Sequence, residues 1–138
     1  MTPLRTRVEA EYEQIERVLE AFPQDQAYAD LSALELAGLS TLLHNFYNGI
    51  ENVLKQVVQD RGLGMPDGPS WHRDLANLAV SNDLISASTS DALRPYLAFR
   101  HFFVHAYAVD LEADRLAPLG KNVEDVFASF RRDVEKAL

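Results

Sequence analysis

The residues best suited to chemistry lie together in one short stretch. Residues 100–107 read Arg-His-Phe-Phe-Val-His-Ala-Tyr, so a guanidinium, two imidazoles and a phenol interrupt an apolar run. A guanidinium suits a phosphate, and an imidazole with a pKa near 6.5 exchanges protons at neutral pH. Arg100 and His105 are therefore the minimum set for cleaving RNA without a metal ion. Their spacing alone instead favours a pair of ordinary residues at a helix packing seam.

The histidines also raise the question of a metal site. His101 and His105 are four residues apart, the spacing of two ligands on one helical face. No Glu stands where the His-Glu-x-x-His pattern requires one, and only His44 and His72 remain as further imidazoles. The chain has no cysteine, which excludes thiolate ligands and a cysteine nucleophile. We expect no metal and no cofactor.

Three other residues are candidates for supporting or modified positions. Tyr107 follows Arg100 by seven residues, which in a continuous helix places both on nearly the same side. Asn48 and Glu51 lie one turn apart on the polar edge of another apolar segment. Glu51 either orients Arg100 through a salt bridge or is an ordinary solvated residue, and we favour the solvated alternative. No Walker, Rossmann or Gly-x-Ser-x-Gly motif is present, which excludes ATP hydrolysis and serine-type hydrolysis.

Length and composition limit the class of protein. A chain of 138 residues has the size of a single domain, here 1–138. The net charge of -8 argues against wrapping nucleic acid by bulk electrostatics, leaves room for a local phosphate site, and suits a basic partner. We find neither a secretion signal nor an apolar run of about 18 residues, so we expect a cytoplasmic protein that does not span a membrane.

Helical spacing of apolar residues organises the first half of the chain. It predicts a helix over residues 3–22, with Thr2 as the cap and Pro3 in the first turn. Ser32 and Glu35 form a capping box for a second, long helix that runs to about residue 61. A Gly/Pro-rich loop follows, which we interpret as a connector.

The second half contains three further predicted helices. The third begins at Asp67 or Ser70 and ends before Asn82. The fourth begins at a cap formed by Ser88 with Asp91 and runs through residue 107, with Pro95 as a kink or as a first-turn residue. The fifth covers residues 122–138. The fold class is therefore all-α, an up-and-down bundle of four to five helices.

The fourth helix is apolar on two sides. One face carries Tyr96, Phe99, Phe102, Phe103 and Ala106, and the other carries Leu93, Leu97, Val104 and Ala108. A helix that is apolar on two sides is buried on two sides, so the second stripe needs another internal helix or a partner chain. A symmetric homodimer is the economical interpretation. Both chains would then contribute Arg100 and His105 to one shared cleft.

Residues 100–107 resemble the HEPN superfamily and, within it, the HepT-like toxins paired with a minimal nucleotidyltransferase antitoxin. The matching pattern is Arg-x-x-x-x-His-x-Tyr, here Arg100, His105 and Tyr107. Residues 93–99, residues 46–52 and the amphipathic last helix are similar to the same group. The residue after the arginine is often Asn or Asp in the superfamily and is His101 here, a departure from that pattern.

The resemblance implies a metal-independent endoribonuclease toxin of a type VII-like toxin–antitoxin system, active as a HEPN-like homodimer. His105 would transfer protons, Arg100 would hold the scissile phosphate, and the products would carry a 2′,3′-cyclic phosphate. The cognate nucleotidyltransferase antitoxin would neutralise the toxin by AMPylation of Tyr107. His101, Glu51 and Asn48 would be supporting residues. The alternatives are a non-catalytic adaptor subunit of a nucleotidyltransferase and a purely structural dimerisation bundle.

Overall fold

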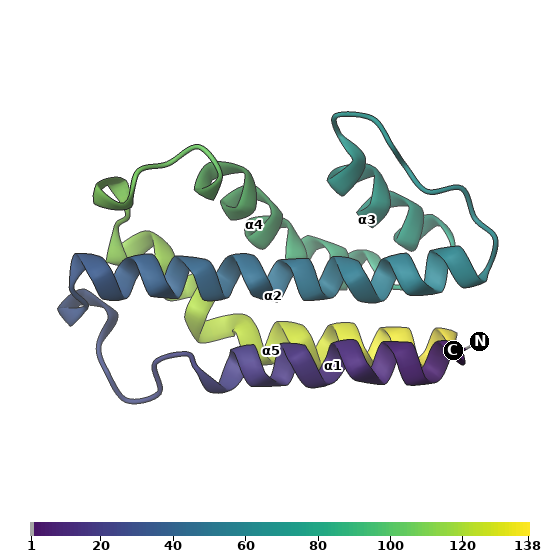
Figure 1. Cartoon of the computed structure of the whole chain (residues 1–138), viewed down its shortest axis with the longest axis horizontal. Helices are drawn as coiled ribbons and strands as arrows, with labels where there is room; N and C mark the ends of the chain where they lie inside the picture. Colours follow the sequence, from purple (N-terminus) through teal and green to yellow (C-terminus); the bar gives the residue numbers. More distant parts are fainter. Residues whose placement is uncertain (1) are drawn as a thin grey trace.

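The computed structural model describes residues 2–138, and for Ala108 the backbone alone. This part of the chain is all-helical and contains no strand, as predicted. The elements are α1 (Leu4–Glu20), η1 (Tyr28–Asp30), α2 (Ala33–Asp60), α3 (Trp71–Ser81), α4 (Ala87–Phe103), η2 (Ala108–Asp110) and α5 (Ala113–Ala137). Helices α1, α2 and α5 lie along the long axis of the molecule, and α3 and α4 lie on the other side of α2 (Figure 1).

Helix α2 is the central element of the bundle. Its predicted capping box is confirmed, because the Ser32 hydroxyl accepts from the Glu35 amide at 3.1 Å and the Glu35 carboxylate accepts from the Ser32 amide at 3.0 Å. The four other α-helices all pack against it. The predicted apolar stripe of α2 forms the core, where Phe46, Ile50 and Val53 are completely buried.

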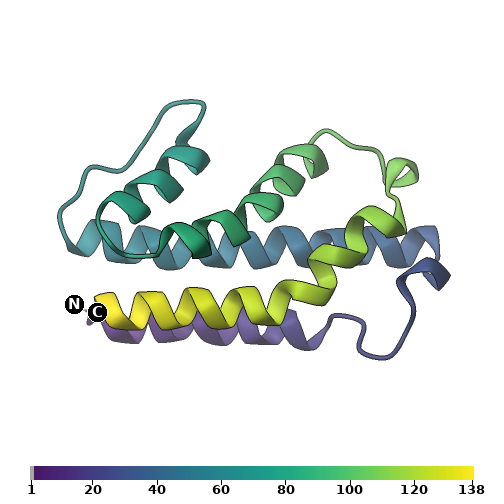
Figure 2. The same cartoon turned by 180° about the vertical axis from the view of Figure 1, so that it is seen from behind.

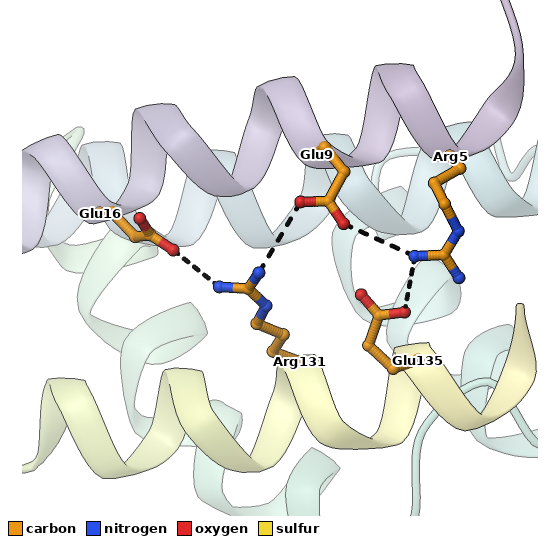
Figure 3. Close-up of polar contacts among 5 residues, drawn as sticks. All are labelled: Arg5, Glu9, Glu16, Arg131 and Glu135. Carbon is orange, nitrogen blue, oxygen red and sulfur yellow. Dashed lines mark hydrogen bonds and ion pairs between the residues drawn. The ribbon is translucent and has the colours of Figure 1, made fainter.

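Helices α1 and α5 are joined at the surface by a network of ion pairs (Figure 3). Arg131 of α5 donates to Glu16 at 2.7 Å and lies 3.7 Å from Glu9, while Arg5 lies 3.5 Å from Glu9 and 3.1 Å from Glu135. The charged face of α1 is therefore also a contact face for α5. Because these side chains are partly exposed, each pair adds little stability.

Helix α4 begins and ends earlier than its sequence pattern predicted. Ser86, not Ser88, is the cap: its hydroxyl accepts from the Thr89 amide at 3.0 Å, and Asp133 of α5 accepts from its amide and its hydroxyl. This tertiary contact fixes the cap two residues upstream. The helix ends at Phe103 and not at Tyr107, since the amides of His105 and Ala106 donate to carbonyls three residues back and the regular ladder stops.

The second apolar stripe of α4 is covered in part by the chain itself. Helix α3 packs against α4, and Leu93 is only 2% exposed within the single chain. Leu97 is half-buried, whereas Val104 is exposed. The side chain of Ala108 lies outside the described residues. An internal helix thus covers the beginning of the stripe, and only its last part is left for a partner chain.

Helix α5 begins at Ala113, nine residues before the predicted start at Asn122. Its added turns contain Pro118, and Figure 2 shows α5 bent in this region. Leu116 in these turns is 1% exposed, so burial stabilises a segment that the proline argues against. Pro95 likewise lies inside α4 and not in its first turn. No helix within residues 2–138 combines the length and apolarity needed to cross a bilayer.

We predict opposite effects of alanine at two glycines of α2. A Cβ at Gly49 would lie 2.5 Å from Cγ1 of the buried Ile15, whereas a Cβ at Gly38 meets nothing within 4 Å. Both substitutions gain helix propensity of about 1 kcal/mol. Only Gly49→Ala overpacks the core, at a cost of about 1–3 kcal/mol. In urea unfolding, Gly49→Ala should be less stable than Gly38→Ala by that overpacking cost, and equal stabilities would contradict the α1–α2 packing.

Candidate functional site

The predicted chemical residues lie at and beyond the C-terminal end of α4. Arg100 and His101 belong to its last turn, whereas His105 and Tyr107 follow the helix. Tyr107 is 76% exposed. The prediction that Tyr107 lies on the same side of a continuous helix as Arg100 is wrong, because the helix ends before it. Aromatic and β-branched residues dominate positions 102–107, and their low helix propensity explains the early end.

The structure brings together the two histidines and not the arginine with His105. The rings of His101 and His105 lie 5.3 Å apart, and both side chains are exposed. Within residues 2–138, no hydrogen bond joins Arg100 to His105, and no group of three His, Asp or Glu side chains converges as metal ligands would. Within one chain, Arg100 and His105 thus lie in different environments.

Arg100 is turned toward α2. Arg100 is half-buried, and its Nε atom is buried without a hydrogen-bond partner among the described residues. Burial, and then the positive charges of Arg100 and His72, lower the pKa of His44. Burial and the Glu51 carboxylate raise the pKa of Tyr47, while Arg100 opposes this rise. The His44 ring also lies 5.2 Å from the ring of Phe103, so the last turn of α4, which carries Arg100, lies against this part of α2.

Glu51 is the most deeply buried charged residue of the described chain. It is only 2% exposed, and its Oε2 atom lies 2.6 Å from Nδ1 of His72, the second residue of α3. The favoured interpretation of Glu51 as a solvated residue is wrong, and so is its alternative as an ion-pair partner of Arg100. A buried carboxylate needs a hydrogen-bonded partner, and α3 supplies it. Asn48, the other predicted supporting residue, is half-buried.

Sequence reasoning missed His44 and His72 as members of this cluster. One signal was available: His44, Tyr47 and Glu51 are spaced three and four residues apart and so share one face of α2. His72 had no such signal, because only tertiary packing brings the start of α3 onto Glu51. Its ring also stacks on Trp71 at 3.6 Å between centroids, and Lys55 lies 4.4 Å from the Trp71 ring.

A cavity of about 390 Å³ lies between α3 and α4 beside this cluster. Tyr47 lines its floor, and Arg73 and Arg94 come from the two flanking helices. Leu93 and Leu97 form its apolar wall, and both share a helical face with Arg100. The cavity therefore combines an apolar wall, two cations and Tyr47 from the α2 stripe that also carries His44 and Glu51.

Comparisons with known proteins bear on this arrangement. A family model described as HepT-like protein matches residues 38–138, which include most of α2 and all of α3, α4 and α5. A solved structure of YutE, a cytosolic protein of unknown function from Bacillus subtilis, superposes with a TM-score of 0.77 and 18% sequence identity, covering 97% of this chain and 90% of that one. At this identity the likeness shows the fold alone. No curated protein matches the chain.

We predict a pH-dependent stability that originates at His44. Burial and the positive charge of Arg100 lower its pKa, so the unfolded chain, with a His pKa of about 6.5, binds this proton more readily than the folded chain. Above about pH 6.5 the free energy of unfolding should have its full value. It should decrease as the pH is lowered below about 6.5, because protonation of His44 then favours the unfolded chain. His44→Leu should weaken this dependence in unfolding experiments between pH 5 and 8. The control Asn45→Leu, at the exposed neighbouring position, should keep it, and an unchanged slope in His44→Leu would contradict the assignment.

Proposed function

The chain belongs to the HepT-like family, a HEPN-type family, and on that premise we propose that it is a metal-independent endoribonuclease toxin. The observation that carries the proposal is the pattern of Arg100, His105 and Tyr107, which lies inside the matched residues 38–138. This pattern supplies a phosphate-binding cation, a proton-transfer group and a phenol that a partner can modify. The reaction takes place in the cytoplasm.

The two catalytic residues have separate tasks. His105 is exposed after the last turn of α4 and transfers protons, as base toward the ribose 2′-hydroxyl or as acid toward the leaving 5′-oxygen. Arg100 holds the scissile phosphate and stabilises its developing charge, a contribution that is usually the largest in such reactions. The products are a 2′,3′-cyclic phosphate and a 5′-hydroxyl. His101, whose ring lies 5.3 Å from that of His105, supports it.

A homodimer completes the site in this proposal. Within one chain Arg100 faces α2, while His105 is exposed at the end of α4, so one protomer does not assemble the pair by itself. Phe102 is 38% and Val104 50% exposed at the same end, which leaves apolar surface for a second copy. Pairing two such ends would bring the arginine of one protomer toward the histidine of its partner.

The second partner is a cognate minimal nucleotidyltransferase antitoxin, as in a type VII-like toxin–antitoxin system. The Tyr107 hydroxyl attacks the α-phosphorus of ATP, forms a phosphodiester with AMP and releases pyrophosphate. The exposure of Tyr107 supports this reaction, because the phenol is accessible to another enzyme. An anionic nucleotide there repels RNA and competes for Arg100.

RNA cleavage tests the ribonuclease assignment. His105→Ala should lower the rate about 10²- to 10⁴-fold, since a positioned proton-transfer group contributes that much. Cleavage is measured on the full chain with EDTA present, together with toxicity in cells and the oligomeric state by light scattering. The control Glu13→Gln, an exposed position on α1, should cut as the unaltered protein does. A folded His105→Ala variant with full activity would refute the assignment, and a wild-type chain that cuts no RNA would favour the adaptor alternative.

Mass spectrometry tests the neutralising modification. After co-expression with the nucleotidyltransferase, the chain should gain the mass of adenylyl groups, and fragmentation should place them on Tyr107. Tyr107→Phe removes the attacking hydroxyl and keeps the ring, so it should stay unmodified and toxic in the presence of the antitoxin. Tyr28→Phe, at a buried phenol, is the matched control and should be neutralised normally. Neutralisation without any modification of Tyr107 would overturn this part of the proposal.

A further inference from the structure

The pair of Glu51 and His72 is built like a proton-transfer unit. The Glu51 carboxylate is 2% exposed and receives its one side-chain hydrogen bond in the described residues from Nδ1 of His72, at 2.6 Å. Because Nδ1 faces an acceptor, it carries the hydrogen in the neutral ring, and Nε2 keeps its lone pair. The same carboxylate–imidazole arrangement fixes the tautomer and orientation of the catalytic base in serine hydrolases.

The free nitrogen of His72 is accessible. The side chain is 17% exposed, and no protein atom of residues 2–138 hydrogen-bonds Nε2. A histidine that only satisfied a buried carboxylate could be covered completely, whereas this one keeps a path to solvent. His72 can therefore exchange protons with a bound molecule while Glu51 holds the ring.

The surroundings of His72 suit an anionic substrate. The His44 ring lies 5.2 Å from the ring of Phe103 in the last turn of α4, which also carries Arg100. His44 also shares a face of α2 with Glu51, the partner of His72, so it lies between the proposed phosphate-binding residue and the Glu51–His72 pair. Glu51 lies at Nδ1 of the His72 ring, and Lys55 lies over the neighbouring Trp71 ring. The beginning of α3 and the end of α4 both lie over α2, on the same side of that helix (Figure 1). The unpartnered atoms Arg100 Nε and His44 Nδ1 are buried there.

We propose that His72 is a further catalytic residue of the RNA cleavage proposed above and that Glu51 is its positioning residue. Nε2 of His72 accepts the proton of the ribose 2′-hydroxyl, and the 2′-oxygen forms a bond to phosphorus. The bond from phosphorus to the 5′-oxygen breaks, and the leaving oxygen takes a proton from the His105 imidazolium. The inference rests on the ribonuclease function and assigns the base and the acid to two different histidines.

The first test compares the rates of His72→Gln, Glu51→Gln and the double variant. His72→Gln should lose about 10²- to 10⁴-fold in cleavage rate. Glu51→Gln should cause a smaller loss of cleavage rate. In the His72→Gln background it should cause no further loss, because both substitutions disable the same Glu51–His72 pair. Asp74→Asn, on the exposed side of α3, is the control and should keep the wild-type rate.

Folding is monitored in every variant through Trp71, the only tryptophan of the chain. Its ring stacks on His72, and an imidazolium in contact quenches indole fluorescence, so a pH titration of the emission also reports the protonation of His72. In the wild type this titration should shift when a 2′-deoxy oligonucleotide that cannot be cleaved is added. In His72→Gln the pH-dependent quenching should disappear.

A substrate with sulfur in place of the leaving 5′-oxygen separates the two histidines. A thiolate departs without being protonated, so this substrate should restore the rate of His105→Ala and leave His72→Gln inactive. Rescue of His72→Gln, a wild-type rate in that variant, or a rate loss that only tracks lost folding would each overturn the inference. If the wild type cuts RNA and requires His105 but not His72, this inference alone fails. A wild type that cuts no RNA overturns the ribonuclease function with it.

Discussion

The structure depends on enclosing α2 on several sides at once. Gly49, Ile50 and Glu51 are consecutive and all buried, and successive residues of a helix point about 100° apart. Helix α1 covers one side of α2, where Ile15 packs directly against Gly49 and occupies the space that a side chain at this position would need. Helix α3 closes another through His72. A helix that is buried on several sides needs apolar neighbours for its apolar residues and hydrogen-bond partners for its polar ones. This requirement determines where the other helices lie.

The same constraint concentrates polar chemistry on one stripe of α2. His44, Tyr47 and Glu51 lie under α3 and α4, where burial makes each polar atom expensive unless it is paired. Glu51 is paired by His72, but Nδ1 of His44 has no partner in the described chain. Arg100 adds an unpaired Nε to the same region. Unpaired buried polar atoms are a feature that ligand sites share, since a ligand can supply the missing hydrogen-bond partners.

Whether a feature of the structure could be predicted from the sequence depends on how far apart in the chain the interacting residues lie. Interactions between residues close in sequence were sufficient to predict α2, through its capping box and apolar spacing, and to predict the all-helical class. They failed for the cap at Ser86, which depends on Asp133 some fifty residues away, and for the first turns of α5, where buried Leu116 outweighs Pro118. The motif at residues 100–107 was visible, whereas the Glu51–His72 pair exists only after α3 has folded onto α2.

The distribution of charge leaves a place where the RNA of the proposed reaction could approach an acidic chain. Within residues 71–107 the three cations Arg73, Arg94 and Arg100 balance the three acids Asp74, Asp83 and Asp91, so the whole net charge of -8 lies in the remaining segments. Three of the four histidines also belong to residues 71–107. An RNA backbone is repelled least by the segment that carries α3 and α4, and its arginines can pair with single phosphates there. The other segments of the chain, which include the α1–α5 ion pairs, are acidic and would repel RNA. This repulsion would favour contact of RNA at the cluster around Arg100.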